Sequence, residues 1–165
     1  MFKKGEYVVY GTSGVCQVQE IGTLDGIVAN KDKLYYTLIM EYSQGGKIFT
    51  PVENPKVMIR KILSKEEVRA LLEQIPEVDE FVITNEKERE HLYKEGIKCC
   101  DCKELIKILK TIESRKKVRI ANGKKMDSID ERYYKRAEEL LYEELMISLQ
   151  MDRNGVKKLL QQHLL

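Results

Sequence analysis

Residues that commonly build active sites are scarce in this sequence. Of its 165 residues only two are histidines, His91 and His163, and neither stands in a pattern that would pair it with a nucleophile. Gly11 and Gly14 lack the following helix and the Lys-Ser/Thr pair of a phosphate-binding loop. We therefore expect a protein that is not an enzyme and that uses no cofactor and no small-molecule substrate.

Long hydrophobic runs are also missing. No stretch approaches the roughly 18 apolar residues that cross a bilayer, and residues 1–6 lead into an alternating pattern instead of the apolar core of a signal peptide. We therefore expect a cytoplasmic protein without a membrane partner. The formal net charge is only +2, so any nucleic-acid binding must come from a local basic patch and not from the charge of the whole chain.

Cysteine is infrequent, but three of the four cysteines are crowded together: Cys99, Cys100 and Cys102. This spacing does not suit a disulfide framework and fits a reducing compartment. Three thiolates with His91 could hold zinc, but Cys100 and Cys102 lie two residues apart, which is poor geometry for one metal on a helix, and no second Cys-x-x-Cys pair occurs. We favour small side chains at the start of a helix capped by Asp101, with no metal. A thiol whose pKa is lowered by that helix is a further alternative.

The first 60 residues show the pattern of β-structure. Apolar and polar residues alternate, or β-branched and aromatic residues cluster, in four segments: 6–10, 15–21, 34–42 and 47–51. Turn-forming pairs such as Gly45-Gly46 separate them. Five short strands in about 60 residues predict a small, strongly bent sheet or barrel. The exposed edges of such a sheet can pair with another chain.

The rest of the chain shows the pattern of α-helices. Ser64 with Glu67 predicts a capping box at the first helix start. Further starts are predicted at Thr84 or Asn85, at Asp101, at Ser128 with Glu131, and at Asp152; Gly96 is expected to end the second helix, Asn122-Gly123 to break the chain, and Leu149 to end the long fourth helix. The sequence therefore predicts an α+β protein with two domains, residues 1–62 and 63–165. The second domain should be all-α, with about four to five helices.

A run of basic residues lies in the predicted helical domain. Between positions 103 and 125 the chain has nine lysines and arginines against two glutamates. Such a cluster can contact DNA phosphates, each contact releasing a counterion, or it can form a solvated helix face. Aromatic residues that stack or wedge are missing from the segment, so any DNA contact there should involve the phosphate backbone and not the bases.

The N-terminal half resembles a known family. Residues 2–10 followed by Gly14 resemble the opening of CarD-like proteins, and Pro51, Asn54 and Arg60 resemble the family's Pro-x-x-Asn…Arg stretch. The family includes the CarD and CdnL regulators and the polymerase-interacting domain of the transcription-repair coupling factor. In the second half, the order of the predicted helix starts is similar to that of the family's helical domain; these starts are Thr84-Asn85, Asp101 and Ser128 with Glu131.

The resemblance implies a Tudor-like or SH3-like β-barrel over residues 1–62 that docks on the β subunit of RNA polymerase by pairing a strand with a sheet edge. It also implies that the helical domain reaches promoter DNA near the upstream edge of the transcription bubble, and that the protein modulates the stability of the open promoter complex. Segments 34–40 and 47–51 are expected to carry the polymerase contact. The residues assigned to that contact are Leu24, Tyr36, Leu38, Ile48, Phe49, Thr50 and Pro51.

The sequence departs from the family where the resemblance assigns DNA contact. Well-known members carry a tryptophan that wedges into the minor groove, whereas this chain has no tryptophan and Glu86 stands at that position. Phosphates repel a carboxylate, so DNA contact must rely on cations. The candidates are Lys87, Arg89, Arg115, Lys116, Lys117, Arg119, Lys124 and Lys125.

Two functional hypotheses follow. In the first, the protein is a transcription regulator that binds the polymerase β subunit and contacts promoter DNA. In the second, it is a protein-interaction adaptor whose helical domain does not bind DNA; the missing tryptophan and the near-neutral net charge favour this alternative. The barrel surface differs from the family too, because Leu24 and Phe49 stand where well-studied members carry arginines facing polymerase.

Overall fold

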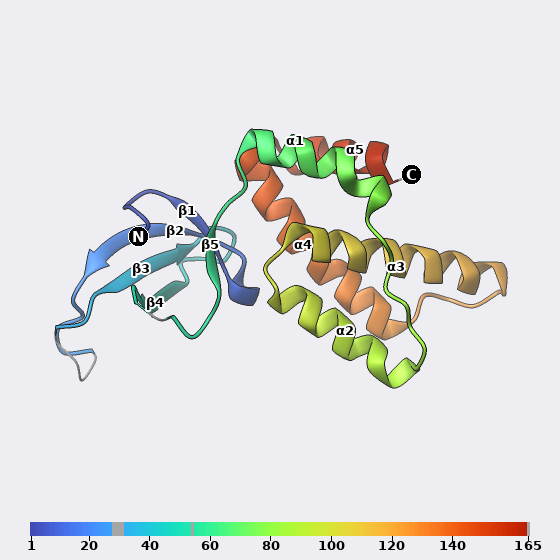
Figure 1. The fold of residues 1–165 in the computed structure, drawn as a ribbon, viewed down its shortest axis with the longest axis horizontal. Coiled ribbons are helices and arrows are strands. Elements are labelled where there is room, and N and C mark those ends of the chain that lie inside the picture. The colour runs from blue at the N-terminus through green and yellow to red at the C-terminus, as the bar shows by residue number, and fades with distance from the viewer. Residues whose placement is uncertain (28–31, 54, 165) are drawn as a thin grey trace. The chain divides into compact units, whose positions relative to one another are not determined.

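A computed structural model describes residues 1–27, 32–53 and 55–164. Its contacts divide the chain into two compact units, Met1–Ile62 and Leu63–Leu165, which we call the β unit and the helical unit. A five-stranded antiparallel sheet is followed by five α-helices, so the expected α+β class is confirmed (Figure 1). Asn54, which carries part of the family resemblance, lies outside the described residues.

The β unit is one antiparallel sheet with the strand order β4-β3-β2-β1-β5. Its strands are β1 (Tyr7–Tyr10), β2 (Val15–Gly22), β3 (Tyr35–Met40), β4 (Lys47–Pro51) and β5 (Ile59–Lys61), with a 3₁₀ turn at Gly11–Ser13. The four segments predicted from the sequence are therefore strands. A register shift between Val18 and Glu20 marks a bulge in β2, which bends a sheet locally.

One face of the sheet forms a small apolar core. Val8, Cys16, Val18, Tyr36 and Leu38 are at most 2% exposed and pack together. They lie on one side because side chains alternate along each strand and the strand register aligns them, for example Val18 opposite Leu38. The alternation seen in the sequence therefore decides which residues are buried.

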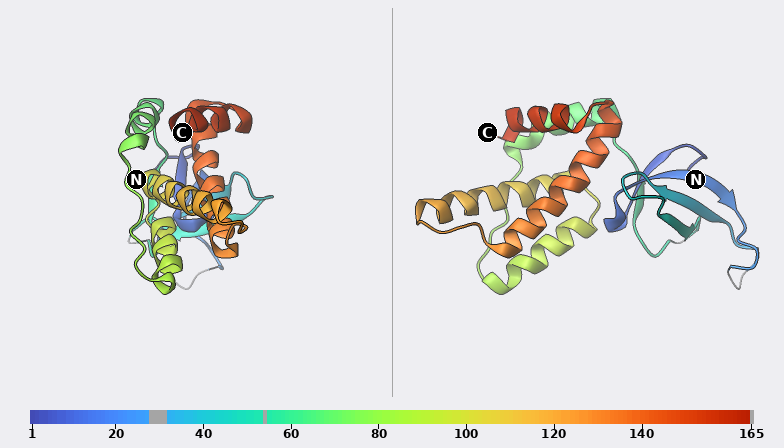
Figure 2. Two further views of the ribbon diagram at one scale, coloured as in Figure 1. Left: turned by 90° about the vertical axis from the view of Figure 1, so that its right-hand side faces the viewer. Right: turned by 180° about the vertical axis from the view of Figure 1, so that it is seen from behind.

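The helical unit packs its longest helices, α3 and α4, against each other, while α1 and α5 lie side by side (Figures 1 and 2). Its elements are α1 (Lys65–Gln74), a 3₁₀ turn (Ile75–Glu77), α2 (Glu86–Lys98), α3 (Cys102–Ala121), α4 (Ser128–Leu149) and α5 (Arg153–Leu164). Ile106, Ile108, Ile112 and Leu141 are fully buried at its centre. Within the part of the chain that the structure describes, no helix has the length and apolar character needed to cross a membrane.

Side-chain caps start these helices where short polar residues precede apolar ones. Ser64 Oγ accepts from Glu67 N (3.1 Å) while Glu67 Oε2 accepts from Ser64 N (2.7 Å), which confirms the predicted capping box. Asp101 caps α3, as predicted. The predicted cap at Ser128 is wrong by one residue, because Asp127 accepts from Ile129 N at 2.9 Å and Ser128 is already helical.

Gly96 does not end α2, contrary to the prediction; the helix continues to Lys98. A Cβ at position 96 would lie 3.1 Å from the Ile108 side chain. The glycine is therefore used for close packing of α2 on α3 and not for a helix stop. The stop comes after Cys99, where Cys100 takes a left-handed φ of 54°.

Candidate interaction surfaces

β4 forms one free edge of the sheet. Met40 N donates to Gly46 O (2.9 Å) and Val52 N donates to Leu34 O (3.0 Å). Because hydrogen-bonded positions alternate along an antiparallel strand, the backbone groups of residues 48 and 50 face β3. Those of Lys47, Phe49 and Pro51 face outward, where no other strand of the described chain pairs with them. The edge can therefore accept a partner strand, while β3, expected at the edge, lies inside the sheet.

Most side chains assigned to polymerase contact point away from solvent. Leu24, Tyr36, Leu38 and Thr50 are at most 9% exposed, and Ile48 packs partly buried against the same core. Such side chains stabilise the β unit and cannot also meet a partner surface. Their assignment is corrected on this ground: these side chains build the sheet and its core and do not contact a partner.

The opposite face of the sheet carries the accessible apolar groups. Phe49 is 43% exposed, and Pro51 is half-buried beside it on β4. Tyr35 pairs with Pro51 across the strands, so both point to this outer face, and Ile39 lies four residues from Tyr35 on the same side. Tyr35 and Ile39 lie in the segment 34–40 that was expected to carry the contact, but they were not among the residues assigned to it, although the strand alternation carried the signal. We call Tyr35, Ile39, Phe49 and Pro51 the outer stripe.

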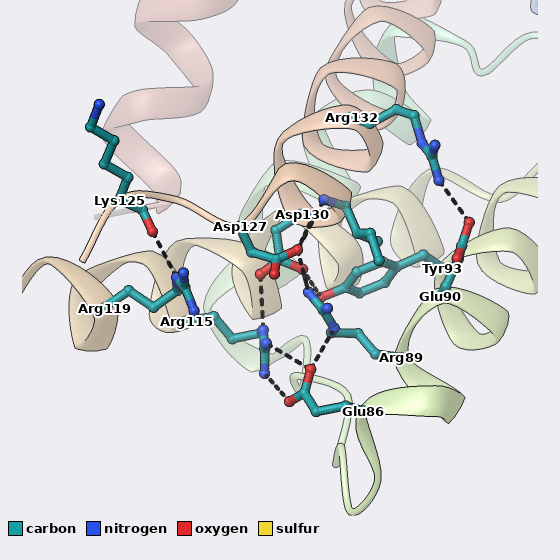
Figure 3. A network of polar contacts seen from close by, with 11 residues as sticks. Glu86, Arg89, Glu90, Tyr93, Arg115, Arg119, Lys125, Asp127, Asp130 and Arg132 are labelled. Atoms are coloured by element: carbon teal, nitrogen blue, oxygen red, sulfur yellow. Dashed lines mark hydrogen bonds and ion pairs between the residues drawn. The ribbon is translucent and has the colours of Figure 1, made fainter. Parts of the chain in front are cut away.

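A network of ion pairs ties α2, α3 and α4 together in the helical unit (Figure 3). Its centre is Asp130, which is 1% exposed and accepts from Arg89 NH1, from Tyr93 Oη (3.0 Å) and from Arg115 Nε (2.9 Å). Arg89 NH1 also donates to Asp127 Oδ1 at 3.0 Å. The buried carboxylate is thus matched by two guanidinium groups and a phenol, as a buried charge requires.

Glu86 closes this network at the surface. Its two carboxylate oxygens lie 3.4 Å from the NH1 and NH2 atoms of Arg115. Glu86 Oε2 also lies 3.0 Å from Arg89 Nε, within ion-pair distance. The Arg89 N–H does not point at this oxygen, so the contact is an ion pair without a hydrogen bond. Glu86, which we expected at the position of the family tryptophan, is therefore held by two arginines and pairs with cations that were expected to contact DNA.

The ion pairs of this network shift the pKa values of Asp127 and Arg89. Burial disfavours the Asp127 carboxylate, but hydrogen bonds from Arg89 and from the backbone N–H groups of Asp130 and Ile129 outweigh it and hold the pKa of Asp127 below its usual range. Burial also disfavours the Arg89 cation, yet its carboxylate partners raise its pKa. Both groups therefore stay charged around neutral pH.

The lowered pKa of Asp127 predicts acid-sensitive stability. At pH 7, Asp127→Asn should lower the free energy of unfolding by about 1.5–3 kcal/mol, the range for hydrogen bonds to charged groups. Because the carboxyl is more acidic in the folded state, its contribution is present above the unfolded pKa of about 3.9 and is lost as pH falls through the folded pKa. Urea unfolding at pH 7 and pH 3 should show the difference between variant and wild type shrinking at pH 3. Asp79→Asn, an exposed carboxylate, is the matched control.

Two of the arginines assigned to DNA are not free surface cations. The Arg89 side chain is 5% exposed and its guanidinium faces carboxylates, so its assignment to DNA contact is corrected. Arg115 retains 24% exposure but is shared between Asp130 and Glu86. Earlier in the basic run, Lys110 Nζ donates to the carbonyls of Ile75 (3.0 Å) and Val78 (2.6 Å), which fixes the turn after α1.

The remaining candidate cations fall into two groups. Lys87 is exposed in the first turn of α2. The others gather where α3 ends and the chain turns into α4, in the segment 116–126 that we call the α3–α4 tip. Its cations are Lys116, Lys117, Arg119, Lys124 and Lys125, and Lys116 and Arg119 are the two that are partly buried. The structure thus brings together five of the eight predicted residues.

The crowded cysteines occupy different environments. Cys99 is exposed at the end of α2, whereas Cys100 and Cys102 are buried. Cys102 Sγ donates to Glu144 Oε2 (3.1 Å), and the other oxygen of that 1% exposed carboxylate accepts from Leu63 N (2.9 Å). Burial and nearby carboxylates raise the pKa of Cys99, the opposite of an activated thiol. Across the described ranges, no three His, Cys, Asp or Glu residues are placed to hold a metal.

The sequence was compared with models of protein families. The model of the CarD-like/TRCF RID domain matches residues 2–63, nearly the whole β unit. A search of curated proteins found no match. Domains of this type interact with RNA polymerase and belong to transcription. The domain has a Tudor-like fold, as expected. The β unit of this chain is therefore a member of the CarD-like/TRCF RID domain family.

Proposed function

We propose that this protein is a bacterial, cytoplasmic transcription regulator that binds the β subunit of RNA polymerase and catalyses no reaction. The observation that carries the proposal is the family match over residues 2–63, in a domain where no other described strand pairs with the outer edge of β4. A partner strand can add to the outward backbone groups of β4, and the outer stripe offers apolar contact beside it.

Binding to polymerase is testable with the whole chain. Titration of the labelled protein with the isolated β lobe should give saturable binding, which the same titration with the α subunit should not. The absence of binding at tens of micromolar would remove the polymerase hypothesis. Binding to the β lobe without any effect on open complex lifetime, followed by promoter fluorescence, would remove only the regulatory part.

For the helical unit we propose contact with promoter DNA through the exposed cations of the α3–α4 tip, which modulates open complex stability. A specific observation keeps the adaptor alternative open: Arg89 and Arg115, two of the predicted DNA ligands, are already paired with carboxylates. The two functions differ in their salt dependence, since an adaptor has no counterions to release from DNA.

Replacing Lys116 and Lys117 with alanine should reduce the slope of log Kobs against log salt by up to about 2, roughly one for each phosphate that is no longer neutralised. The measurement is fluorescence anisotropy with duplex DNA over a range of salt concentrations. The matched control is the double variant of Lys157 and Lys158, an exposed lysine pair on α5, which should leave the slope unchanged. Equal slopes for both variants would favour the adaptor.

A further inference from the structure

Two large aliphatic side chains are exposed in the most basic part of the molecule. Val118 and Ile120, in the last turns of α3, are 62% and 57% exposed. Single exposed apolar residues are common, but these two share the α3–α4 tip with five cations. Figures 1 and 2 show that the end of α3 and the loop into α4 extend beyond the other helices of the unit. The tip therefore offers apolar and cationic groups together.

The charge of the tip specifies the kind of partner. Residues 116–126 contain five lysines and arginines and no aspartate or glutamate. The next carboxylate in the chain, Asp127, is engaged by Arg89. A segment of this composition is electrostatically complementary to a polyanion.

The tip is held in one conformation by its own hydrogen bonds. Lys124 N donates to Arg119 O (2.8 Å), Gly123 N donates to Ile120 O (3.0 Å), and Arg119 Nε donates to Lys125 O (2.7 Å; Figure 3). Gly123 takes a φ of +71°, which a residue with a side chain rarely adopts. A partner therefore meets a preformed element and need not order a loop.

Val118 and Ile120 lie on nearly opposite sides of the helix, because residues two apart differ by about 200°. Val118 lines a shallow hollow with Ser114, Arg115 and Arg119. On the other side, Ile120 follows Lys116 by one turn. Each aliphatic side chain thus has a cation next to it, and an apolar contact on either side can be accompanied by a phosphate contact.

We infer that the end of α3 enters the major groove of B-form DNA, with Val118 and Ile120 against thymine methyl groups and the cations on the flanking phosphates. The inference rests on the proposed DNA contact of the helical unit, and it adds contact with the bases where the sequence led us to expect contact with the phosphate backbone alone. A helix with side chains is about 10–12 Å across, which fits a major groove about 12 Å wide and not a minor groove about 6 Å wide. The thymine methyl is the apolar group in that groove.

Other anionic partners fit less well. An amphipathic helix on a lipid surface presents one continuous apolar face, whereas Val118 and Ile120 point to opposite sides of α3. The major groove of an RNA duplex is deep and narrow, so a helix cannot enter it. The observations therefore favour duplex DNA over a membrane or double-stranded RNA.

The test compares an A·T-rich duplex with the same duplex in which uracil replaces thymine, a change that removes only the methyl groups. The full-length wild type should bind the uracil duplex about fourfold more weakly for each methyl group that it touches in the thymine duplex. The double variant Val118→Ser, Ile120→Ser should bind the thymine duplex about 16-fold more weakly than wild type, about fourfold for each lost methyl contact, with an unchanged salt slope. It should also bind both duplexes equally.

The matched control is Val82→Ser. It replaces a different exposed valine of the helical unit, with 82% exposure, and should bind DNA like wild type. Thermal melting checks that the double variant is folded, and the thymine–uracil comparison with wild type needs no variant. Equal wild-type affinity for both duplexes would overturn the groove contact while leaving the proposed phosphate contact intact. Binding to anionic phosphatidylglycerol vesicles but not to DNA would overturn both.

Discussion

Asp130→Asn should lower the free energy of unfolding of the helical unit by about 3–5 kcal/mol, the range for removing one partner of a buried ion pair. Asparagine keeps the shape of the side chain but removes the charge that faces Arg89 and Arg115. Arg89 would then remain as a largely buried cation whose carboxylate partners are Asp127 and Glu86. Urea unfolding followed by circular dichroism measures the decrease.

The neighbouring Glu131→Gln makes the same charge change at an exposed position of α4 and should cost less than about 0.5 kcal/mol. A second comparison isolates the charge effect. Combining Asp130→Asn with Arg89→Met should be less destabilising than Asp130→Asn alone, because the unpaired buried cation is then removed as well. If the single and double variants were equally unstable, the network would act through packing and not through charge.

Phe49→Pro should weaken binding to the polymerase β lobe at least about 30-fold, while the β unit stays folded. The N–H of residue 49 faces away from β3, so proline there removes a donor to the partner strand without breaking the sheet's own ladder. It also deletes an exposed aromatic ring of the kind that dominates interface energies. Titration of the full chain with the β lobe measures the effect.

Three further variants separate the parts of this prediction. Phe49→Ala keeps the backbone donor and should cost about tenfold in affinity. Thr50→Pro places the ring where the N–H faces β3 and should unfold the sheet. Met58→Ala removes an exposed apolar side chain next to the opposite edge strand β5 and should change nothing. If Phe49→Pro bound normally, β4 would not be the docking edge.

Local sequence patterns predicted the helices and strands well, because the interactions that start and end these elements join residues close together in the sequence. A capping box needs only Ser64 and Glu67, three residues apart, and both of its hydrogen bonds form. The buried residues of α1, which are Val68, Leu71 and Leu72, lie three and four positions apart, the spacing of one face of a helix. Where two local signals compete, the boundary moves: Asp127 precedes Ser128 and accepts two backbone N–H groups, so it takes the cap.

The roles of the charged residues could not be read from the sequence. Arg89 and Asp130 are 41 positions apart, and no local pattern shows that folding brings them together. A buried arginine looks the same as a surface one until the packing of α2 on α4 is known. The prediction for Gly96 was wrong for a similar reason, since the use of that glycine depends on Ile108 of another helix.

The side chains of the docking surface could have been assigned better. In β4, positions 47, 49 and 51 share one face and 48 and 50 the other, so Phe49 and Thr50 cannot both meet a partner with their side chains. Placing Ile48 against the core requires the strand register, which sets it directly opposite the buried Leu38. What the sequence pattern lacked was the register that joins β3 to β4.

The short outer edge of β4 also bears on self-association. An exposed strand is a template on which copies of a protein can stack into sheets. Here the edge opens with a lysine and closes with Pro51, which has no N–H to offer a second copy. Stacking would bring the Lys47 charges of successive molecules close to one another. The same five residues that can hold one foreign strand thus limit growth into aggregates, which should keep the protein monodisperse at high concentration.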